Sequence, residues 1–337
     1  MQDNYKILND IKPFNDVFFK SCFYHSLFPI IGYFQESISP YISNEIIMYN
    51  NKGKIGFGIE YYSSKGIDQL LRETNIKCNT IDTSNNIIND ICNSVSNNSP
   101  VIIWIDCFYA QIRNDTFSKI HWPHTWLIYG YDLSKKLFNI IEHSRREKLT
   151  YDKRTISSSD LVDSYLGYLK YFQKDMSSIP TFLYFEKAKS IRNKEVFSPI
   201  KSDLEILINN INENRNKILL GIEYILEFKS FYKDTVNSEN ALKGNIYQLL
   251  EMLNEIINAK EIEKYKAFRY FKNNDELYNI IISIINCWTS LRAVLARYLY
   301  SSEYIVEALN DSVKIIDSIY NFEIQYYNQI CNKKGRL

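Results

Sequence analysis

Apolar residues recur at every third or fourth position through most of the chain beyond residue 199. This periodicity is typical of helices that bury one face, and it predicts a series of long helices. The periodic stretches cover residues 204–225, 246–257, 277–298 and 306–320. Helices that carry one apolar stripe each pack their stripes together. The sequence therefore predicts an all-α helical bundle over residues 196–337.

The first part of the chain carries shorter and more varied patterns. An apolar run at residues 22–34 predicts a buried helix, and short apolar or alternating runs predict strands. The clearest hairpin joins residues 125–131 to residues 137–142 through a polar turn. All 7 Pro lie at or before Pro199. Because turns and strand ends use proline and long helices exclude it, we expect an α+β domain over residues 1–195.

Composition narrows the function classes. Lys and Arg number 40 against 39 Asp and Glu, so the net charge of +1 gives no basis for nucleic-acid binding. The 6 Cys include no CxxC pair and the first residues lack the apolar core of a signal peptide. We therefore expect a cytoplasmic protein with reduced thiols. The longest apolar stretch, residues 280–291, is shorter than the about 20 residues that span a bilayer, so no membrane segment is expected.

Two residues of the first part suit nucleophilic catalysis. Cys22 opens the predicted apolar helix, and the partial positive charge of a helix N-terminus lowers the pKa of a thiol. His124, one of 4 His, opens a predicted strand after Pro123 and is the best candidate for a base. A carboxylate must then hold the imidazole in one tautomer. Asp106 ends the preceding strand, and Glu142 shares the face of His124 in the hairpin register, so both are candidates.

Three segments around these residues carry recognisable motifs. They read SCFYHSL at residues 21–27, PVIIWIDCFY at residues 100–109 and HWPHTWLIYGYD at residues 121–132. Together they resemble the N-terminal domain of butirosin biosynthesis protein H and its relatives, over about residues 10–190. The resemblance implies a papain-like fold with an appended helical region. In it Cys22 matches the nucleophile, His124 the base and Asp106 the strand aspartate.

The resemblance also implies an activity. The family suggests a cysteine acyltransferase that takes an acyl group from the phosphopantetheine thioester of an acyl or peptidyl carrier protein. The enzyme passes this group through acyl-S-Cys22 to a small amine, in secondary-metabolite biosynthesis, with no metal or cofactor of its own. The family pattern favours Asp106 over Glu142 as the partner of His124. The oxyanion-hole Gln usual in papain-like enzymes is absent, and Asn15 is the candidate for that role.

Aromatic and basic residues near these positions suggest how substrates are held. The expected walls of a substrate cleft are Phe108, Tyr109, Trp122 and Trp126, although core packing explains them equally well. A carrier protein is usually acidic around its phosphopantetheine arm. The cluster Arg145, Arg146 and Lys148 has the charge to meet it, although a solvated charged turn is the commoner explanation.

Other functions are open to the same residues. Cys22-x-x-His25 and His121-x-x-His124 have the ligand types and spacings of a zinc site, although Pro123 constrains the second pair to extended backbone. A cysteine peptidase or amidase would use the same catalytic groups with water as the acceptor. A non-catalytic docking protein would keep the fold without the chemistry.

Overall fold

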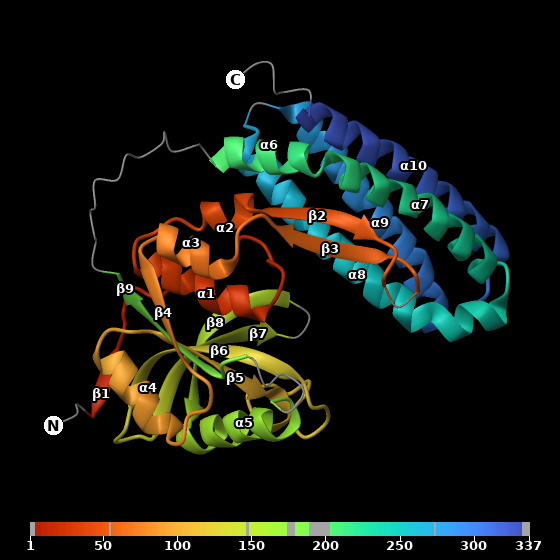
Figure 1. Ribbon diagram of the computed structural model, residues 1–337. Helices are drawn as coiled ribbons and strands as arrows, with labels where there is room; N and C mark the ends of the chain where they lie inside the picture. Colours follow the sequence, from red (N-terminus) through yellow and green to blue (C-terminus); the bar gives the residue numbers. More distant parts are fainter. Residues whose placement is uncertain are drawn as a thin grey trace. The chain divides into compact units, whose positions relative to one another are not determined.

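The computed structural model describes residues 4–53, 55–145, 148–173, 179–188, 203–272 and 274–331. The chain, drawn in Figure 1, divides into two compact units. Unit 1 consists of Met1–Ile38 and Gly66–Glu195, and unit 2 of Ser39–Lys65 and Val196–Leu337. The fold is α+β, as predicted, with an antiparallel sheet in unit 1 and a helical C-terminal region in unit 2. The predicted first domain of residues 1–195 differs from unit 1 in residues 39–65, which belong to unit 2.

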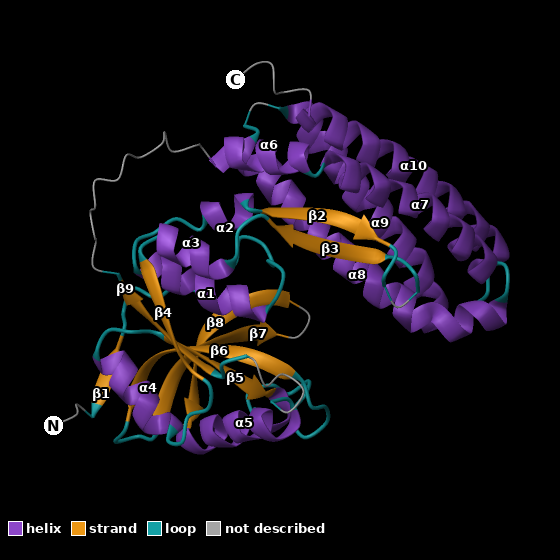
Figure 2. Cartoon of the chain, viewed as in Figure 1, coloured by secondary structure: helices purple, strands orange, loops and turns teal. Residues whose placement is uncertain are grey.

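Unit 1 is built on an antiparallel sheet (Figure 2). Its described strands are ordered β4 (Ile76–Ile81), β9 (Phe182–Lys187), β5 (Val101–Asp106), β6 (Pro123–Asp132), β7 (Leu137–Arg145) and β8 (Lys148–Ser157), and β1 (Tyr5–Ile7) pairs with β6. The predicted hairpin is β6–β7. β5 and β6 are apolar and buried almost throughout, which is why they lie inside the sheet and form its core.

Helices pack against this sheet. They are α1 (Cys22–Tyr33), α3 (Ile67–Glu73), α4 (Ile87–Ser96) and α5 (Ser158–Tyr171), with a short 3-10 helix η1 (Cys107–Tyr109) directly after β5. In Figure 1, α1 lies on one side of the sheet and α4 and α5 on the other. α1 packs against β6, and its residues from His25 to Ile31 are buried. The start of α1 is thereby held beside the first residues of β6.

Unit 2 is a bundle of long helices that carries a two-stranded hairpin. Its described elements are α2 (Ser39–Ser43), β2 (Glu45–Asn50), β3 (Gly58–Ser63), α6 (Asp203–Glu213), α7 (Arg215–Val236), α8 (Glu239–Tyr270), α9 (Asp275–Ser301) and α10 (Val306–Cys331). The predicted stripes meet in one core that includes Ile225, Leu253 and Trp288. The helix predicted over residues 204–225 is divided at Asn214. The Asn214 side chain donates to the Asn210 carbonyl at 2.9 Å, a local bond of the kind that competes with helix continuation.

The hairpin belongs to unit 2 because its first strand is buried against the helices. β2 is buried from Glu45 to Tyr49 and packs against α7. A Cβ atom at Gly221 of α7 would lie 2.6 Å from the Tyr49 carbonyl oxygen. Only glycine allows the helix backbone to approach the strand this closely. A strand buried in this way cannot be separated from the bundle. This explains why residues 39–65 belong to unit 2, although the sequence places them in the first domain.

A buried charge cluster lies in the core of unit 2. Lys260 Nζ lies 2.7 Å from Glu263 Oε2 and 2.8 Å from Glu323 Oε1. The Tyr49 hydroxyl donates to Glu323 and the Tyr327 hydroxyl to Glu263, each at 2.6 Å. Burial lowers the pKa of Lys260, but the two carboxylates outweigh burial and raise its pKa above the ordinary value. The lysine therefore stays charged and ties α8 to α10.

Replacing Lys260 by Met is expected to lower the free energy of unfolding by about 3 kcal/mol, because the buried carboxyls lose their cation. The matched control is Lys264→Met on the same helix, because the Lys264 side chain is 32% exposed and its amine pairs with Glu261. Its expected cost is at most about 1 kcal/mol. Urea unfolding followed by circular dichroism measures both variants. Equal losses in the two would contradict a stabilising role for the buried cluster.

Among the described helices, only α9 is long and apolar enough to cross a membrane by length and composition. The helix packs against α8 and α10, and nine of its residues, from Leu277 to Tyr298, are buried in the bundle. The core helix of a soluble bundle has the same composition, so one such helix is weak evidence for a membrane protein.

Candidate active site

Cys22 is the first residue of α1. The preceding Ser21 has extended backbone angles, and its side chain makes no capping hydrogen bond. Lys20 adopts a left-handed conformation (φ 54°), which turns the chain into the helix. The first N–H groups of a helix lack intrahelical partners and carry partial positive charge. The Cys22 thiol therefore lies where an anion is stabilised.

Cys22 differs electrostatically from the other cysteines. Burial alone would raise the pKa of its thiol, but the charge of His124 and hydrogen bonds from His124 and Thr125 lower that pKa below the ordinary value. The pKa of each of the other five cysteines is raised, chiefly by burial. Cys107, which also feels the charge of His124, has its pKa raised to about 11. Cys22 is therefore the one cysteine of the chain whose surroundings favour a thiolate.

His124 is the proton partner of Cys22. Its side chain is 4% exposed, and burial lowers the pKa of a histidine, but the charges of Glu142 and Cys22 raise the pKa of His124 well above its usual range. Nε2 faces Glu142 Oε1 at 3.1 Å, which leaves Nδ1 for the thiol of Cys22. The neighbouring His25 and His143 have pKa values lowered to about 4 by burial and by the charge of the other imidazoles. Only His124 in this group is therefore poised as an imidazolium.

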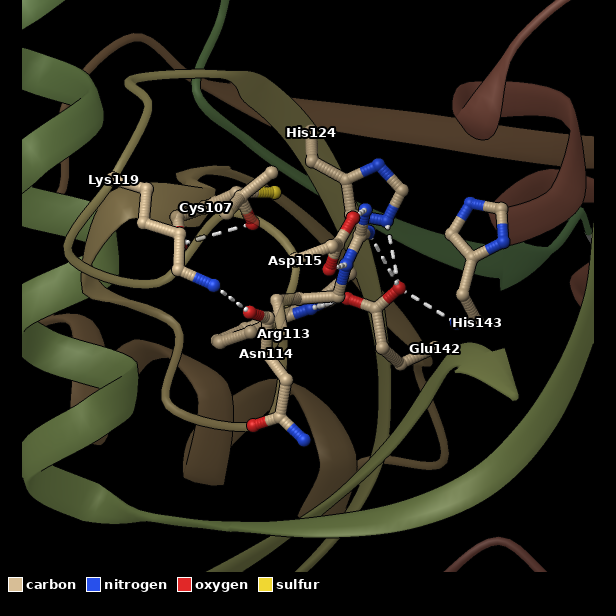
Figure 3. Close-up of polar contacts among 10 residues, drawn as sticks. Cys107, Arg113, Asn114, Asp115, Lys119, His124, Glu142 and His143 are labelled. Carbon is tan, nitrogen blue, oxygen red and sulfur yellow. Dashed lines mark hydrogen bonds and ion pairs between the residues drawn. The ribbon is translucent and has the colours of Figure 1, made fainter. Parts of the chain in front are cut away.

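Glu142 holds His124 in place (Figure 3). Besides His124 Nε2, its carboxylate accepts from Trp126 Nε1 at 2.5 Å, Arg113 Nη1 at 3.2 Å and the backbone N–H of His143 at 2.6 Å. Burial raises the pKa of a carboxyl, but the charge of His124 and its hydrogen bond, followed by the charge of Arg113, hold the pKa of Glu142 far below its usual range. Glu142 is thus a fully satisfied buried carboxylate that fixes both the tautomer and the orientation of the imidazole.

Arg113 is a site residue that the sequence reasoning missed. It comes from the loop between η1 and β6 and makes two bonds to Asp115, each 3.0 Å long, besides its contact with Glu142. The Arg113 and Asp115 side chains are only 13% and 14% exposed. The spacing Arg-x-Asp hints at a local ion pair, but nothing along the chain links it to Glu142, 29 residues further on.

Asp106 does not partner His124, contrary to the family-based expectation. In the β5–β6 register His124 is opposite Ile105 and Asp106 is opposite Pro123, so alternation places Asp106 and His124 on opposite faces of the sheet. The Asp106 carboxylate instead bonds His121 Nδ1 at 2.6 Å and the backbone N–H groups of Phe108 and Trp122. Its role is to hold η1 and the chain before β6. The alternative partner, Glu142, is the carboxylate that the structure brings to His124.

The Asn15 side chain is bound to the backbone of Tyr151. Its Oδ1 accepts from the Tyr151 N–H at 2.7 Å, and its Nδ2 donates to the Tyr151 carbonyl at 3.0 Å. This pair of bonds imitates a strand partner for β8. Asn15 therefore clamps the backbone of Tyr151, and a role in stabilising an oxyanion stays a prediction.

The four aromatic residues expected to wall a cleft lie in different surroundings. The ring of Phe108 stacks on His121 at 4.3 Å between centroids, and Tyr109 lies 6.2 Å from the same ring. Trp122 is 56% exposed. Trp126 is fully buried and bonds Glu142, so it supports the site and forms no open wall. Of the basic residues expected to meet a carrier, Arg146 and the side chains of Arg145 and Lys148 lie outside the described residues.

The expected zinc ligands are not assembled. His25 receives the Phe19 N–H on Nε2 and faces the Phe14 carbonyl with Nδ1, so both of its nitrogens are occupied. His121 is held by Asp106. A different set, His124, Glu142 and His143, offers ligand atoms within 4.8 Å of one another among the described residues. A metal ion there would have to compete with Arg113 for Glu142 and with Cys22 for His124.

Comparison with known proteins gives no further guidance, because no protein-family model and no curated protein matches the chain. What the site can do therefore follows from its own geometry. A thiolate at a helix N-terminus, an imidazolium beside it and a buried carboxylate behind the imidazolium form the arrangement of a nucleophilic cysteine with its general acid and base.

Proposed function

We propose that unit 1 is a papain-like cysteine acyltransferase that moves an acyl group from a carrier-protein thioester to an amine. The observation that carries the proposal is the Cys22–His124–Glu142 alignment, with Cys22 at the start of α1 and His124 on the antiparallel sheet. A cysteine at a helix N-terminus that faces Nδ1 of a strand histidine is the arrangement expected of the papain-like class. The sequence resemblance to the butirosin biosynthesis protein H family supports the same assignment and supplies the substrate class.

The first step loads the cysteine. The Cys22 thiolate attacks the carbonyl carbon of the phosphopantetheine thioester and forms a tetrahedral oxyanion. The carbon–sulfur bond to phosphopantetheine then breaks, and the leaving thiolate takes the proton of the His124 imidazolium. Acyl-S-Cys22 and a neutral His124 remain. One thioester has replaced another, so the step is nearly isoenergetic.

The second step forms the amide. The nitrogen of an amine attacks the acyl carbon, and neutral His124 accepts a proton from that nitrogen. The bond between the acyl carbon and Cys22 sulfur breaks, which regenerates the thiolate and imidazolium pair. An amide is more stable than a thioester, so this step runs downhill without ATP. In the proposed mechanism His124 gives and accepts each proton, and no metal takes part. That the enzyme needs no metal stays a prediction.

The six free cysteines suit the reducing cytoplasm that the proposal assumes.

The experiment is to mix the protein with an acyl-loaded carrier protein and measure its intact mass. We expect an increase equal to the acyl group, mapped by peptide analysis to Cys22, and no increase for Cys22→Ser. Cys107→Ser is the matched control, because Cys107 lies near His124 but its raised pKa keeps it a thiol, so this variant should load normally. Addition of an amine should discharge the adduct to an amide.

The same measurement separates the alternatives. An adduct that water discharges as fast as an amine would identify a hydrolase, the peptidase or amidase class. No adduct from any carrier thioester, together with a Cys22 thiol that is alkylated no faster than a free cysteine, would leave only a docking role and would refute the proposed activity.

A further inference from the structure

The Tyr151 hydroxyl has no hydrogen-bond partner although it is buried. Tyr151 lies on β8 and is 1% exposed, and its oxygen is one of few buried side-chain polar atoms without a partner in the described residues. An unpaired hydroxyl in a protein interior is costly, and native structures rarely keep one without a use. A group that binds in this place would satisfy the hydroxyl.

The position of Tyr151 is tightly fixed. Its ring packs against two imidazoles, that of His25 at 4.5 Å between centroids and 9° between planes, and that of His143 at 4.2 Å and 32°. Its backbone is held by the two bonds to Asn15. The side chain therefore cannot turn away to find another partner, and its hydroxyl keeps one direction. Preorganised donors of this kind need no rearrangement when a charge forms.

Tyr151 also lies beside the nucleophile. His25, which stacks on its ring, follows Cys22 by three residues on α1 and so lies on the same side of the helix. His143, which also contacts the Tyr151 ring, stacks on His124 at 5.5 Å between centroids. Burial and then the charge of Cys22 raise the pKa of Tyr151 far above its usual range, so the group keeps its proton and remains a donor.

We propose that the Tyr151 hydroxyl donates a hydrogen bond to the oxyanion that forms when Cys22 attacks a carbonyl group. The inference rests on the proposed function, because it needs Cys22 to be the acylated nucleophile. A side-chain donor would complement the first N–H groups of α1, which supply only part of the usual oxyanion hole, and Asn15 is bound to the Tyr151 backbone through both its Oδ1 and its Nδ2. The bond forms with the tetrahedral intermediate and is absent in the free enzyme, so it lowers the barrier selectively.

The test compares two reactions of Cys22 in Tyr151→Phe, which keeps the stacked ring and removes only the hydroxyl. Acylation by p-nitrophenyl acetate or by the carrier thioester passes through an oxyanion, whereas alkylation by iodoacetamide does not. We expect acylation to slow by about 10- to 100-fold and alkylation to keep the wild-type rate. The matched control is Tyr131→Phe on β6, whose buried hydroxyl bonds Ser96 Oγ at 2.6 Å, and both rates should be unchanged there.

Two results would overturn the inference. Acylation at the wild-type rate in Tyr151→Phe would show that the hydroxyl touches no oxyanion. Equal slowing of acylation and alkylation would show that Tyr151 acts on the thiolate or on the fold instead. Failure of the proposed function is a separate result, in which carrier thioesters would not acylate the wild-type protein. The comparison of p-nitrophenyl acetate with iodoacetamide would still decide the role of Tyr151.

Discussion

At pH 6, His124→Ala is expected to slow acylation of Cys22 by about 10³-fold and its alkylation by iodoacetamide by about 10²-fold. Without the imidazolium, burial dominates and the pKa of the Cys22 thiol returns to its ordinary value of 9.0 or above. Such a thiol is about one part in a thousand thiolate at pH 6. The higher intrinsic nucleophilicity of a more basic thiolate offsets part of the loss in alkylation. Acylation loses the proton donor of the leaving thiol as well, so it suffers more.

In the wild type, the same ion pair of Cys22 and His124 determines how the rates of acylation and alkylation change with pH. Cys22 has a lowered pKa and His124 a raised one, so the ion pair exists between the two values. As the pH falls through the pKa of Cys22, the thiolate takes a proton and both reactions slow. As the pH rises through the pKa of His124, the imidazolium loses its proton, and only acylation slows because it needs that proton. We therefore expect a bell-shaped profile for acylation and a single rise to a plateau for alkylation.

Rates measured from pH 5 to pH 10 by stopped flow and by intact mass check this prediction. His121→Ala is the control, because His121 is bound by Asp106 and should leave both profiles unchanged. An alkylation profile of the wild type centred near pH 9 would mean that Cys22 is an ordinary thiol, and the ion pair would have to be abandoned.

The parts of this arrangement that could be predicted from sequence are those set by local periodicity. The stripes that include Ile225, Leu253 and Trp288 predicted the bundle, because each stripe repeats within its own helix. The β6–β7 hairpin is equally local. Its register pairs Leu127 with Ile141, and continuing it brings Glu142 to the face of His124, as the turn length predicts.

The parts that could not be predicted depend on contacts between distant segments. Asp106 was favoured by family resemblance, but the pairing of β5 with β6 decides which face it occupies. Arg113 reaches Glu142 from a loop without periodicity. The position of the Tyr151 hydroxyl, which has no hydrogen-bond partner, is fixed by His25, 126 positions earlier in the chain, and by the bonds of Asn15. A pattern along the chain carries no information on which polar atom the fold leaves unpaired.

Glu142→Gln is expected to slow acylation of Cys22 by about 10³-fold, whereas Asp106→Asn should change it by less than about 3-fold. The Glu142 carboxylate accepts four N–H groups, from His124, Trp126, Arg113 and the His143 backbone. The amide of glutamine must direct an NH₂ group at some of these donors and brings no negative charge. Arg113 then repels a proton on His124, so the pKa of His124 falls and the thiolate loses its counterion.

Asp106→Asn is the matched control for this prediction, because Asp106 is also a buried carboxylate of the same sheet and bonds a histidine. Both variants are expected to lose some stability, so thermal unfolding is followed alongside acylation by p-nitrophenyl acetate and by the carrier thioester. The alkylation profile separates positioning from folding: in Glu142→Gln its rise should move to higher pH, whereas in Asp106→Asn it should stay in place. If Asp106→Asn moved the profile and Glu142→Gln did not, the carboxylate that governs His124 would be the one favoured by the family pattern, and the hydrogen bond between Glu142 and His124 would have no part in activating Cys22.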